Sequence, residues 1–360
     1  MKILSIESSC DETSVAIVED GRRVWANVIA SQIVEHAQTG GVVPEVAARR
    51  HVDAMMPVLQ RAFEEAGDLA ETRGLARIGW DDIDAIAVTR EPGLVGCVAI
   101  GRAAAEALAF AHGKPLILTN HIHGHMYSGW LYGAELGSGT AASSDAADEI
   151  PSEPEFPALI LTVSGGHSDI WLMRGHGDFE ILGKTVDDAA GEAFDKVSRL
   201  LGLGYPGGPV IERRALDGNP AAVDFPRAAM RDYDFSFSGL KTAVLYYLQG
   251  EIKARPELLA DDGNFANGQF VNDVAASFQE AVVDALVSKL IKAVKEYAPR
   301  EVHLVGGCSA NRHLREKIVA RLARGKRPPV FRTPVKMSYC TDNAAMIGGA
   351  AYWLKNPPLD

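Results

Sequence analysis

Two histidines four residues apart are the first candidates for chemistry in this sequence. His121 and His125 lie in a run with three histidines, and His123 between them is spaced to point elsewhere. On a helix, residues four apart project from one face, so both imidazoles can bind one divalent metal and leave its other positions open. No glutamate lies between them as in the H-E-x-x-H motif of zinc proteases. The spacing alone leaves two interpretations open, a metal site and a solvated or core-lining histidine pair.

Asp342 carries the carboxylate that could complete such a site. It lies in the polar stretch 338–343, which opens a closing helix of small residues over 344–354. The simplest role of an aspartate at a helix start is an N-cap or a first-turn acid. It is also the free carboxylate that we pair with His121 and His125.

Two polar turns between apolar strands share one design. The first, Ser8–Thr13, joins strands 2–7 and 14–18, and the second, Ser164–Ser168, joins strands 158–163 and 169–173. Such turns can present hydroxyl and backbone N–H groups to a phosphate, and paired glycines let the backbone approach a ligand closely. Ordinary turn chemistry also explains the two acids of the first turn, Asp11 and Glu12. The repeated hairpin predicts two similar halves facing a nucleotide.

Further candidates lie in the second half of the chain. Asp195 lies one to two turns into a helix, where capping does not explain it, and Gly208 belongs to a Tyr-Pro-Gly-Gly-Pro loop that opens a helix bearing Glu212. Strand 301–305, two glycines and a helix that begins after Asn311 follow in order. This arrangement is typical of a cradle for the sugar or phosphate of a nucleotide.

Predicted strands alternate with predicted helices along the chain. Segments 83–89 and 116–120 are expected strands, and segments 44–66, 94–111 and 269–297 are expected helices. The last helix carries an apolar stripe at i+4 spacing that predicts core packing: Val274, Phe278, Val282, Leu286 and Leu290. The alternation predicts βαβ units, mostly parallel sheets and an α/β fold.

Composition indicates a soluble globular protein. The chain has 360 residues, of which 47% are hydrophobic and 23% charged, so it is long enough for two domains. Its four cysteines lie far apart, which favours reduced thiols in a cytosol over a disulfide framework. The first residues predict a strand rather than a signal peptide, and the longest apolar runs are too short or too rich in glycine to predict a membrane span.

Charge is unevenly distributed. The formal net charge of −11 argues mildly against a nucleic-acid partner. Segment 133–157 holds six acids and no lysine or arginine, and it predicts a mobile loop at a domain boundary. Segment 312–327 instead carries seven basic residues against one acid. The simplest interpretation of that run is a solvated helix face rather than a nucleic-acid contact.

Eight strings, in order from Met1 to about Gly349, resemble the bacterial TsaD family of tRNA N(6)-adenosine threonylcarbamoyltransferases. They are Ile6–Thr13, Asn120-His121-x-x-x-His125, Val163–His167, Asp187–Lys196, Tyr205–Gly208, Phe237–Thr242, Gly306–Asn311 and Thr341–Met346. The resemblance implies the actin, Hsp70 and sugar-kinase (ASKHA) fold, an α/β fold of two similar halves with a nucleotide cleft between them. We expect an N-terminal half over 1–132 closed by helix 342–356, an acidic flexible insert over 133–157, and a C-terminal half over 158–335.

The resemblance also implies a reaction. The family transfers the threonylcarbamoyl group from threonylcarbamoyl-AMP to N(6) of adenosine 37 in tRNAs that read ANN codons. Its metal ligands correspond to His121, His125 and Asp342, with Fe(2+) expected and Zn(2+) as the alternative. Its substrate-binding positions correspond to Thr162, Val163, Ser164, Gly165, Gly166, Asp195, Gly208, Glu212 and Asn311, of which the position of Glu212 varies within the family. Asp11 and Glu12 are hypothetical catalytic residues that could orient the substrate or accept the amine proton.

The resemblance implies partner proteins, and the sequence differs from the family pattern in two places. Members act with a paralogous TsaB-type subunit and a TsaE-type P-loop ATPase, so we expect both here, with a cytoplasmic location, no membrane, and possible binding of ATP or ADP. Glu91 stands where the family usually has glycine, and the acidic insert is longer than usual.

Other functions remain open at this stage. A metalloprotease would use the histidine pair, but this sequence has no glutamate between the two histidines to act as the general base. An ATPase, chaperone or sugar kinase of the same fold, or a nucleotide-binding scaffold protein, would explain the hairpins but would leave His121, His125 and Asp342 without a role.

Overall fold

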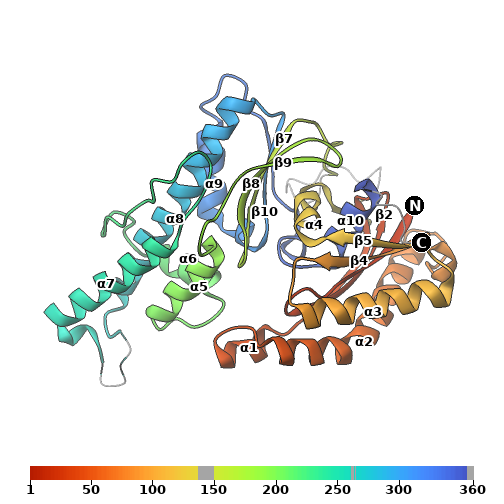
Figure 1. The fold of residues 1–360 in the computed structure, drawn as a ribbon, viewed down its shortest axis with the longest axis horizontal. Coiled ribbons are helices and arrows are strands. Elements are labelled where there is room, and N and C mark those ends of the chain that lie inside the picture. Colours follow the sequence, from red (N-terminus) through yellow and green to blue (C-terminus); the bar gives the residue numbers. More distant parts are fainter. Residues whose placement is uncertain (137–149, 261–262, 264, 355–360) are drawn as a thin grey trace. The chain divides into compact units, whose positions relative to one another are not determined.

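The computed structural model describes residues 1–136, 150–260, 263 and 265–354, which form two compact units (Figure 1). Unit 1 comprises Met1–Pro154 and the chain from Arg332 onward. Unit 2 comprises Glu155–Phe331. The last helix of the chain therefore belongs to the same unit as the first strand.

Unit 1 is built on a six-stranded sheet in the order β5-β4-β1-β2-β3-β6. The first three strands form an antiparallel meander, whereas β4 pairs parallel to β1 and β5 pairs parallel to β4. The strands are β1 (Lys2–Glu7), β2 (Glu12–Glu19), β3 (Arg23–Ser31), β4 (Ala85–Glu91), β5 (Leu116–Asn120) and β6 (Tyr132–Gly133). The carboxyl ends of β1, β4 and β5 consequently meet at one edge of the sheet.

Each face of this sheet packs against a different set of helices, because side chains alternate between the faces of a strand. Leu4 and Ile6 of β1 share an apolar core with α2 (Pro44–Thr72) and α3 (Val95–His112). Ile3 lies on the other face and packs with α10 (Ala344–Leu354). The remaining helices of the unit are α1 (Ile33–Thr39) and α4 (His121–Tyr127), and Figure 1 shows α4 beside α10.

Helix α3 corrects one expectation from the sequence. It is the one helix among the described residues that is long and apolar enough to cross a membrane by length and composition. A single helix of this kind is weak support for a membrane span, because helices of soluble domains pass the same test. The buried positions of α3 are Cys97, Gly101, Ala105 and Ala109, spaced four apart. These small side chains let it lie close to the sheet and α2.

Unit 2 holds a five-stranded sheet in the order β11-β10-β7-β8-β9. Its strands are β7 (Ala158–Val163), β8 (Ser168–Gly175), β9 (Asp178–Lys184), β10 (Glu301–Val305) and β11 (Val330–Arg332). Its helices are α5 (Ala190–Leu200), α6 (Gly207–Ala215), α7 (Ser238–Ala254), α8 (Gly268–Tyr297) and α9 (Arg312–Leu322). All five members of the predicted stripe on α8 are buried, which confirms the prediction of core packing. Short 3-10 turns lie at Trp80–Asp82, Ser128–Trp130, Pro256–Leu258, Gly307–Ala310 and Met337–Tyr339.

The two sheets repeat one strand arrangement. In each, a three-stranded antiparallel meander comes first, and a later strand then pairs parallel to the first strand of the meander. This repeat agrees with the two similar halves predicted from the duplicated hairpins. The sheets are mixed, however, so the prediction of mostly parallel sheets holds only for unit 1, where three of the five strand pairings are parallel. The meanders contribute antiparallel pairs that βαβ alternation does not reveal.

The acidic segment is described only at its two ends. Residues 137–149 lie outside the described residues, and the predicted mobile loop falls largely on them. The end that follows is held in place, since the Arg22 guanidinium pairs with the Glu153 carboxylate and donates to the carbonyl oxygens of Pro151 and Ser152. The Glu155 N–H then donates to the Glu301 carboxylate of unit 2 at 3.1 Å.

Candidate metal centre and substrate-binding loops

Helix α4 holds both histidines of the predicted metal site. It begins directly after β5, and Asn120 is its N-cap, because its side-chain oxygen accepts from the N–H groups of Ile122 at 2.9 Å and His123 at 3.2 Å. This cap fixes where the helix starts and therefore which residues share a face. His121 and His125 lie one turn apart on that face, with ring centroids 4.7 Å apart.

Asp342 reaches the histidines because α10 packs closely against α4. A Cβ atom on Gly124 would lie 2.8 Å from Cδ1 of Ile347, so the close approach of the helices depends on glycine there. The N-cap interpretation of Asp342 was wrong, since Asn343 accepts from the Met346 N–H at 3.1 Å and takes that role. The carboxylate of Asp342 is left free to face α4.

The three predicted ligands form one cluster. Oδ1 of Asp342 lies 3.1 Å from Nε2 of His125 and 3.4 Å from Nε2 of His121. One ligand atom from each of the three residues lies within 4.8 Å of the others. The histidines are buried, and the Asp342 side chain keeps 24% of its surface exposed. Two imidazole nitrogens and one carboxylate oxygen form a donor set that suits Fe(2+) or Zn(2+) and leaves coordination positions open.

The electrostatics of the cluster favour a cation at its centre. Burial acts to lower the pKa of His121, but the carboxylates of Asp342 and Glu7 outweigh it and hold that pKa well above its usual value. Burial acts to raise the pKa of Asp342, but His121 and His125 hold it well below its usual range. The two carboxylates thus favour a positive charge beside them, either a proton on His121 or a divalent metal that would take the place of this proton.

Glu7 belongs to the family string Ile6–Thr13, but the sequence analysis did not assign it to the metal site. Its fully buried carboxylate lies 3.0 Å from Nδ1 of His121 and accepts from the Thr89 hydroxyl and the Ser9 N–H, each at 2.5 Å. The Ser9 hydroxyl lies 3.2 Å from the same Nδ1. The available signal was a polar residue at the end of each of two expected apolar strands, Glu7 in 2–7 and Thr89 in 83–89, since parallel pairing of β1 and β4 brings Glu7 and Thr89 together near His121.

The first polar turn carries Asp11 and Glu12. Burial, the charges of Asp342 and Asp11, and a hydrogen bond shared with Asp11 raise the pKa of Glu12 to about 10. Its Oε1 accepts from the Ser31 hydroxyl at 3.3 Å.

His51 of α2 holds this turn in place and was also missed. Its Nε2 lies 3.0 Å from the carbonyl oxygen of Cys10, and its Nδ1 lies 2.8 Å from the Thr13 hydroxyl. A carbonyl oxygen only accepts, so Nε2–H donates to Cys10 and Nδ1 accepts from Thr13. Burial lowers the pKa of His51, in keeping with a neutral ring. No sequence pattern marks this histidine, because 38 residues separate it from Thr13.

The second polar turn lies in unit 2 between β7 and β8. Thr162 and Val163 are buried in β7, whereas Gly165 and Gly166 are exposed, with nothing within 4 Å of an added Cβ at either position. The Ser164 N–H donates to the His167 carbonyl at 2.8 Å, so it is used within the turn. Of the backbone N–H groups that this turn was expected to present to a phosphate, that of Ser164 is therefore engaged, and those of Gly165 and Gly166 are the candidates.

The remaining predicted residues of unit 2 organise the helix starts around this turn. Asp195 accepts from the Gly207 N–H at 2.7 Å, and Glu212 accepts from the Arg312 N–H at 2.6 Å. Asn311 caps α9 by accepting from the Leu314 N–H at 2.8 Å. Gly208 has open space where a Cβ would lie. Asp195, Glu212 and Asn311 therefore have a structural role besides the ligand binding to which sequence reasoning had assigned them.

Cys308 and two glycines show that these residues lie close to one another. Burial raises the pKa of the Cys308 thiol to about 12, and the carboxylates of Asp195 and Glu212 add to the effect. A Cβ on Gly306 would lie 2.5 Å from the Val163 oxygen, and one on Gly191 would lie 2.5 Å from the Ser164 oxygen. Unit 2 thus gathers its nine predicted substrate-binding residues around one end of β7 and β10, while unit 1 holds the metal ligands and the acids of the first turn.

Comparison with known proteins identifies the family. Residues 23–349 match the TsaD family, tRNA N6-adenosine threonylcarbamoyltransferase. A protein of that name from Thermomicrobium roseum is 47% identical, over 98% of this chain and 92% of its own length. One from Symbiobacterium thermophilum is 48% identical, over 98% of this chain and 91% of its own length.

Solved structures with low sequence identity share the fold. HypF from T. kodakarensis matches with a TM-score of 0.57 and 12% identity, over 98% of this chain and 47% of that chain. Component A of the Acidaminococcus fermentans (R)-2-hydroxyglutaryl-CoA dehydratase matches with a TM-score of 0.50 and 14% identity, over 99% of this chain and 98% of that chain. The predicted ASKHA-type α/β fold is confirmed. The chain belongs to the tRNA N6-adenosine threonylcarbamoyltransferase (TsaD) family of acyltransferases, as its motifs predicted.

Proposed function

We propose that this chain transfers the threonylcarbamoyl group from threonylcarbamoyl-AMP to N(6) of adenosine 37 in tRNAs that read ANN codons. The observation that carries the proposal is the convergence of His121, His125 and Asp342 in a chain of this family, across 217 residues of sequence. An ATPase or kinase would leave this buried cluster without a role. A metalloprotease is not favoured either, because the carboxylate of Glu7, which lies beside the cluster, is engaged by His121, Thr89 and Ser9.

The reaction breaks the bond between the carbamoyl carbon and the AMP phosphate oxygen. The adenine amine attacks that carbon, loses a proton, and AMP leaves with the electron pair. A metal held by His121, His125 and Asp342 would act as a Lewis acid toward the developing negative charge. We infer Fe(2+) as the metal, with Zn(2+) as the alternative, and a threonylcarbamoyl-AMP ligand, with ATP or ADP as possible occupants of the same nucleotide site.

In unit 2 we assign ligand contacts to the second turn and its neighbours. We propose that the N–H groups of Gly165 and Gly166 donate to a phosphate or an oxyanion, together with the hydroxyl of Ser164, whose oxygen accepts from the His167 N–H at 3.1 Å. Open space beside Gly208 suits close approach of a ligand to the backbone. The other proposed substrate-binding residues are Thr162 and Val163, which lie buried in β7 before the turn, and Asp195, Glu212 and Asn311, which hold the starts of α6 and α9.

We assign the amine proton to Asp11 rather than to Glu12. Burial and the neighbouring carboxylates raise the pKa of Glu12 to about 10, which makes Glu12 the poorer proton acceptor of the two. Asp11→Ala should therefore slow transfer while adenylate binding is retained. Full transfer by Asp11→Ala, with tight adenylate binding, would rule this role out.

Partners and location follow from the family as proposals. We propose a tRNA substrate, a TsaB-type subunit, a TsaE-type ATPase and a cytoplasmic location. The acidity of this chain, with a net charge of −11, is consistent with partners contributing part of the positive charge that tRNA requires.

The test is transfer of labelled threonylcarbamoyl from the purified adenylate to tRNA, with partner proteins added. We expect wild-type transfer to be lost in His121→Ala. His123→Ala is the matched control, because His123 lies on the same helix outside the cluster and should retain activity within a few-fold. If the wild type shows no transfer with partners that are verified as active, the proposal fails.

A further inference from the structure

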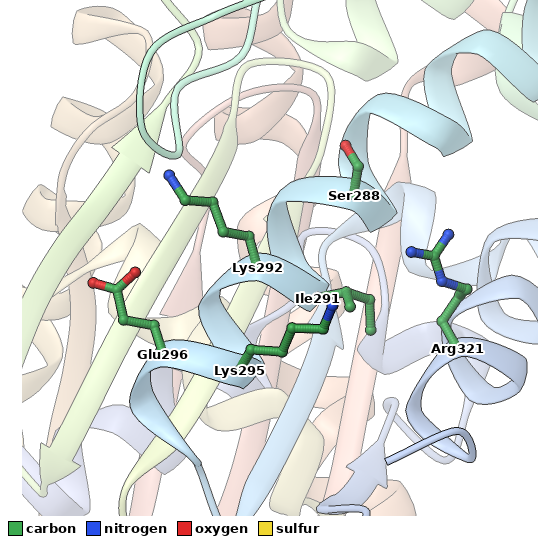
Figure 2. A pocket seen from close by; sticks show the side chains of 6 residues that line it. All are labelled: Ser288, Ile291, Lys292, Lys295, Glu296 and Arg321. Atoms are coloured by element: carbon green, nitrogen blue, oxygen red, sulfur yellow. The ribbon is translucent and has the colours of Figure 1, made fainter.

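Basic side chains of unit 2 gather where α8 and α9 end. Two hollows of about 380 and 330 Å³ share Ile291, Lys295 and Arg321 in their walls, so they adjoin. Figure 2 shows Lys295 extending along the side of α8 that faces Arg321 of α9, whereas Lys292 and Glu296 project from the other side of α8. We call Lys295, Arg321, Arg324 and Arg327 the basic groove.

The second hollow is lined by all four cations of the basic groove and, among the described residues, by no carboxylate. The other residues in its wall are mainly apolar: Ile291, Val294, Leu322, Pro328 and Pro329. The one acid of the first hollow, Glu296, accepts a hydrogen bond from the Tyr233 hydroxyl at 2.5 Å. Four cations around about 330 Å³ repel one another and favour an anionic ligand.

The structure divides the basic run at 312–327 into two parts. Arg312 pairs with Glu316 at 2.6 Å, and Lys317 pairs with Asp284 at 2.7 Å and with Glu280. This first part is the solvated, ion-paired helix surface that the sequence predicted. The second part, Arg321 to Arg327, has no ion pair recorded among the described residues, so its charge is not offset locally.

The helix dipole explains only part of the basic groove. Lys295 and Arg321 lie in the last turns of α8 and α9, where a cation is favourable without any ligand. Arg324 and Arg327 follow the end of α9 and are exposed. The helix dipole does not explain why Arg324 and Arg327 line the same hollow as Lys295 and Arg321.

We propose that the basic groove binds the sugar-phosphate backbone of the tRNA substrate, an inference that rests on the proposed function. The chain as a whole has a net charge of −11 and repels a polyanion, so tRNA needs a local concentration of unpaired cations. Three arginines suit phosphate oxygens, because a guanidinium can donate two parallel hydrogen bonds. The apolar wall is suited to contact with the sugar of the same backbone.

The test measures binding of an unmodified tRNA to the full-length chain with partner proteins, between 50 and 200 mM salt. The variant Lys295→Ala/Arg321→Ala removes two cations of the groove. The matched control is Lys114→Ala/Lys253→Ala, which removes two lysines that lie elsewhere, one before β5 and one on α7. Both proteins are first shown to unfold at the wild-type temperature.

We expect the groove variant to bind tRNA roughly tenfold more weakly at 100 mM salt, while the control stays within about twofold. The slope of log K against log [salt] should fall by about 1.4 to 1.8, because two phosphate contacts are lost. Wild-type affinity and slope in the groove variant would overturn the proposal, as would equal weakening in the control. Inorganic tripolyphosphate is the second probe, and its binding to the wild type but not to the groove variant at micromolar concentration would instead identify a site for small anions.

Transfer activity of the wild type is measured on the same preparations. A wild type that transfers threonylcarbamoyl, with tRNA affinity unaffected in the groove variant, would overturn the groove and leave the function standing. A wild type that binds tRNA through the groove but transfers no threonylcarbamoyl would overturn the proposed function and leave the groove standing.

Discussion

The carboxylate of Glu7 lies 3.0 Å from Nδ1 of His121, at the end of β1 and at the start of α4. Because the carboxylate can accept the Nδ1 proton, Nε2, which lies on the side of Asp342, is the nitrogen of His121 that would bind a metal. His125 differs, since its Nδ1 is buried and has no hydrogen-bond partner among the described residues. Glu7 therefore holds the ring of His121 in one orientation, whereas no hydrogen bond to Nδ1 among the described residues holds the ring of His125 in the same way.

Replacing Glu7 should weaken metal binding. Glu7→Gln keeps the size of the side chain but removes the charge that stabilises the proton on Nδ1, and loss of such an outer contact typically costs about 10- to 100-fold in metal affinity. Competition with a chelator on the full-length protein measures this directly, without reference to activity. Thr89→Val is the milder variant, since it removes only one hydrogen-bond donor to Glu7, and it should lower metal affinity only a few-fold. Unchanged affinity in Glu7→Gln would show that Glu7 does not orient His121.

Gly124 should be intolerant of even a methyl group. Gly124→Ala places a Cβ 2.8 Å from Cδ1 of Ile347 and 3.0 Å from Cγ of Met346, so α4 and α10 must separate or the side chains must shift. We expect a loss of about 1 to 3 kcal/mol of stability and weaker metal binding. Gly250→Ala on α7 is the control, because nothing lies within 4 Å of its Cβ, and it should stabilise by about 0.5 to 1 kcal/mol. Thermal unfolding of both variants gives the comparison, and equal shifts would contradict the packing argument.

His51 should stabilise the first turn. In His51→Ala, the Cys10 carbonyl and the Thr13 hydroxyl lose their partner in a buried site, which we expect to cost about 1 to 3 kcal/mol. The transfer rate should fall as well, because Asp11 and Glu12 lie between the two residues that His51 contacts. His112→Ala is the control, since that exposed ring stacks on Trp80 and lies far along the chain from the turn. Wild-type stability and transfer in His51→Ala would exclude the positioning role.

Asp169 should make stability depend on pH. Burial raises the pKa of this carboxyl to about 6 from an ordinary value of 3.8, partly offset by Lys184. A raised pKa in the folded state means that the contribution to stability is fully present below about 3.8 and is lost as the pH rises through about 6. Asp169→Asn should remove this loss, which is about 3 kcal/mol, so the stability of the variant should rise relative to that of the wild type between pH 4 and pH 7. Denaturant unfolding across that range measures the difference.

Lys184→Met supplies the opposite comparison for Asp169. Without the lysine charge the pKa of Asp169 should rise further, so stability should fall more steeply with pH than in the wild type. Equal pH profiles in the wild type, Asp169→Asn and Lys184→Met would show that Asp169 does not titrate in this range.

Local patterns in the sequence were sufficient to predict much of the fold. The hairpin of β1 and β2, the buried stripe on α8 and the duplicated Gly-rich turn all depend on side-chain periodicity and turn chemistry within short windows. The spacing of His121 and His125 belongs to the same class, because helix geometry alone brings residues four apart together. The eight family strings predicted the family for the same reason, since each is a short contiguous segment.

Tertiary structure decided which of these groups work together. Asp342 joins the histidines only because α10 packs on α4 at Gly124, and Glu7 reaches His121 only because β1, β4 and β5 end at one sheet edge. The sequence could not show that Asn343 takes the N-cap, that the sheets are mixed, or which part of the basic run lacks ion pairs. Each of these depends on contacts between residues distant in the chain, and periodicity carries no information about such contacts.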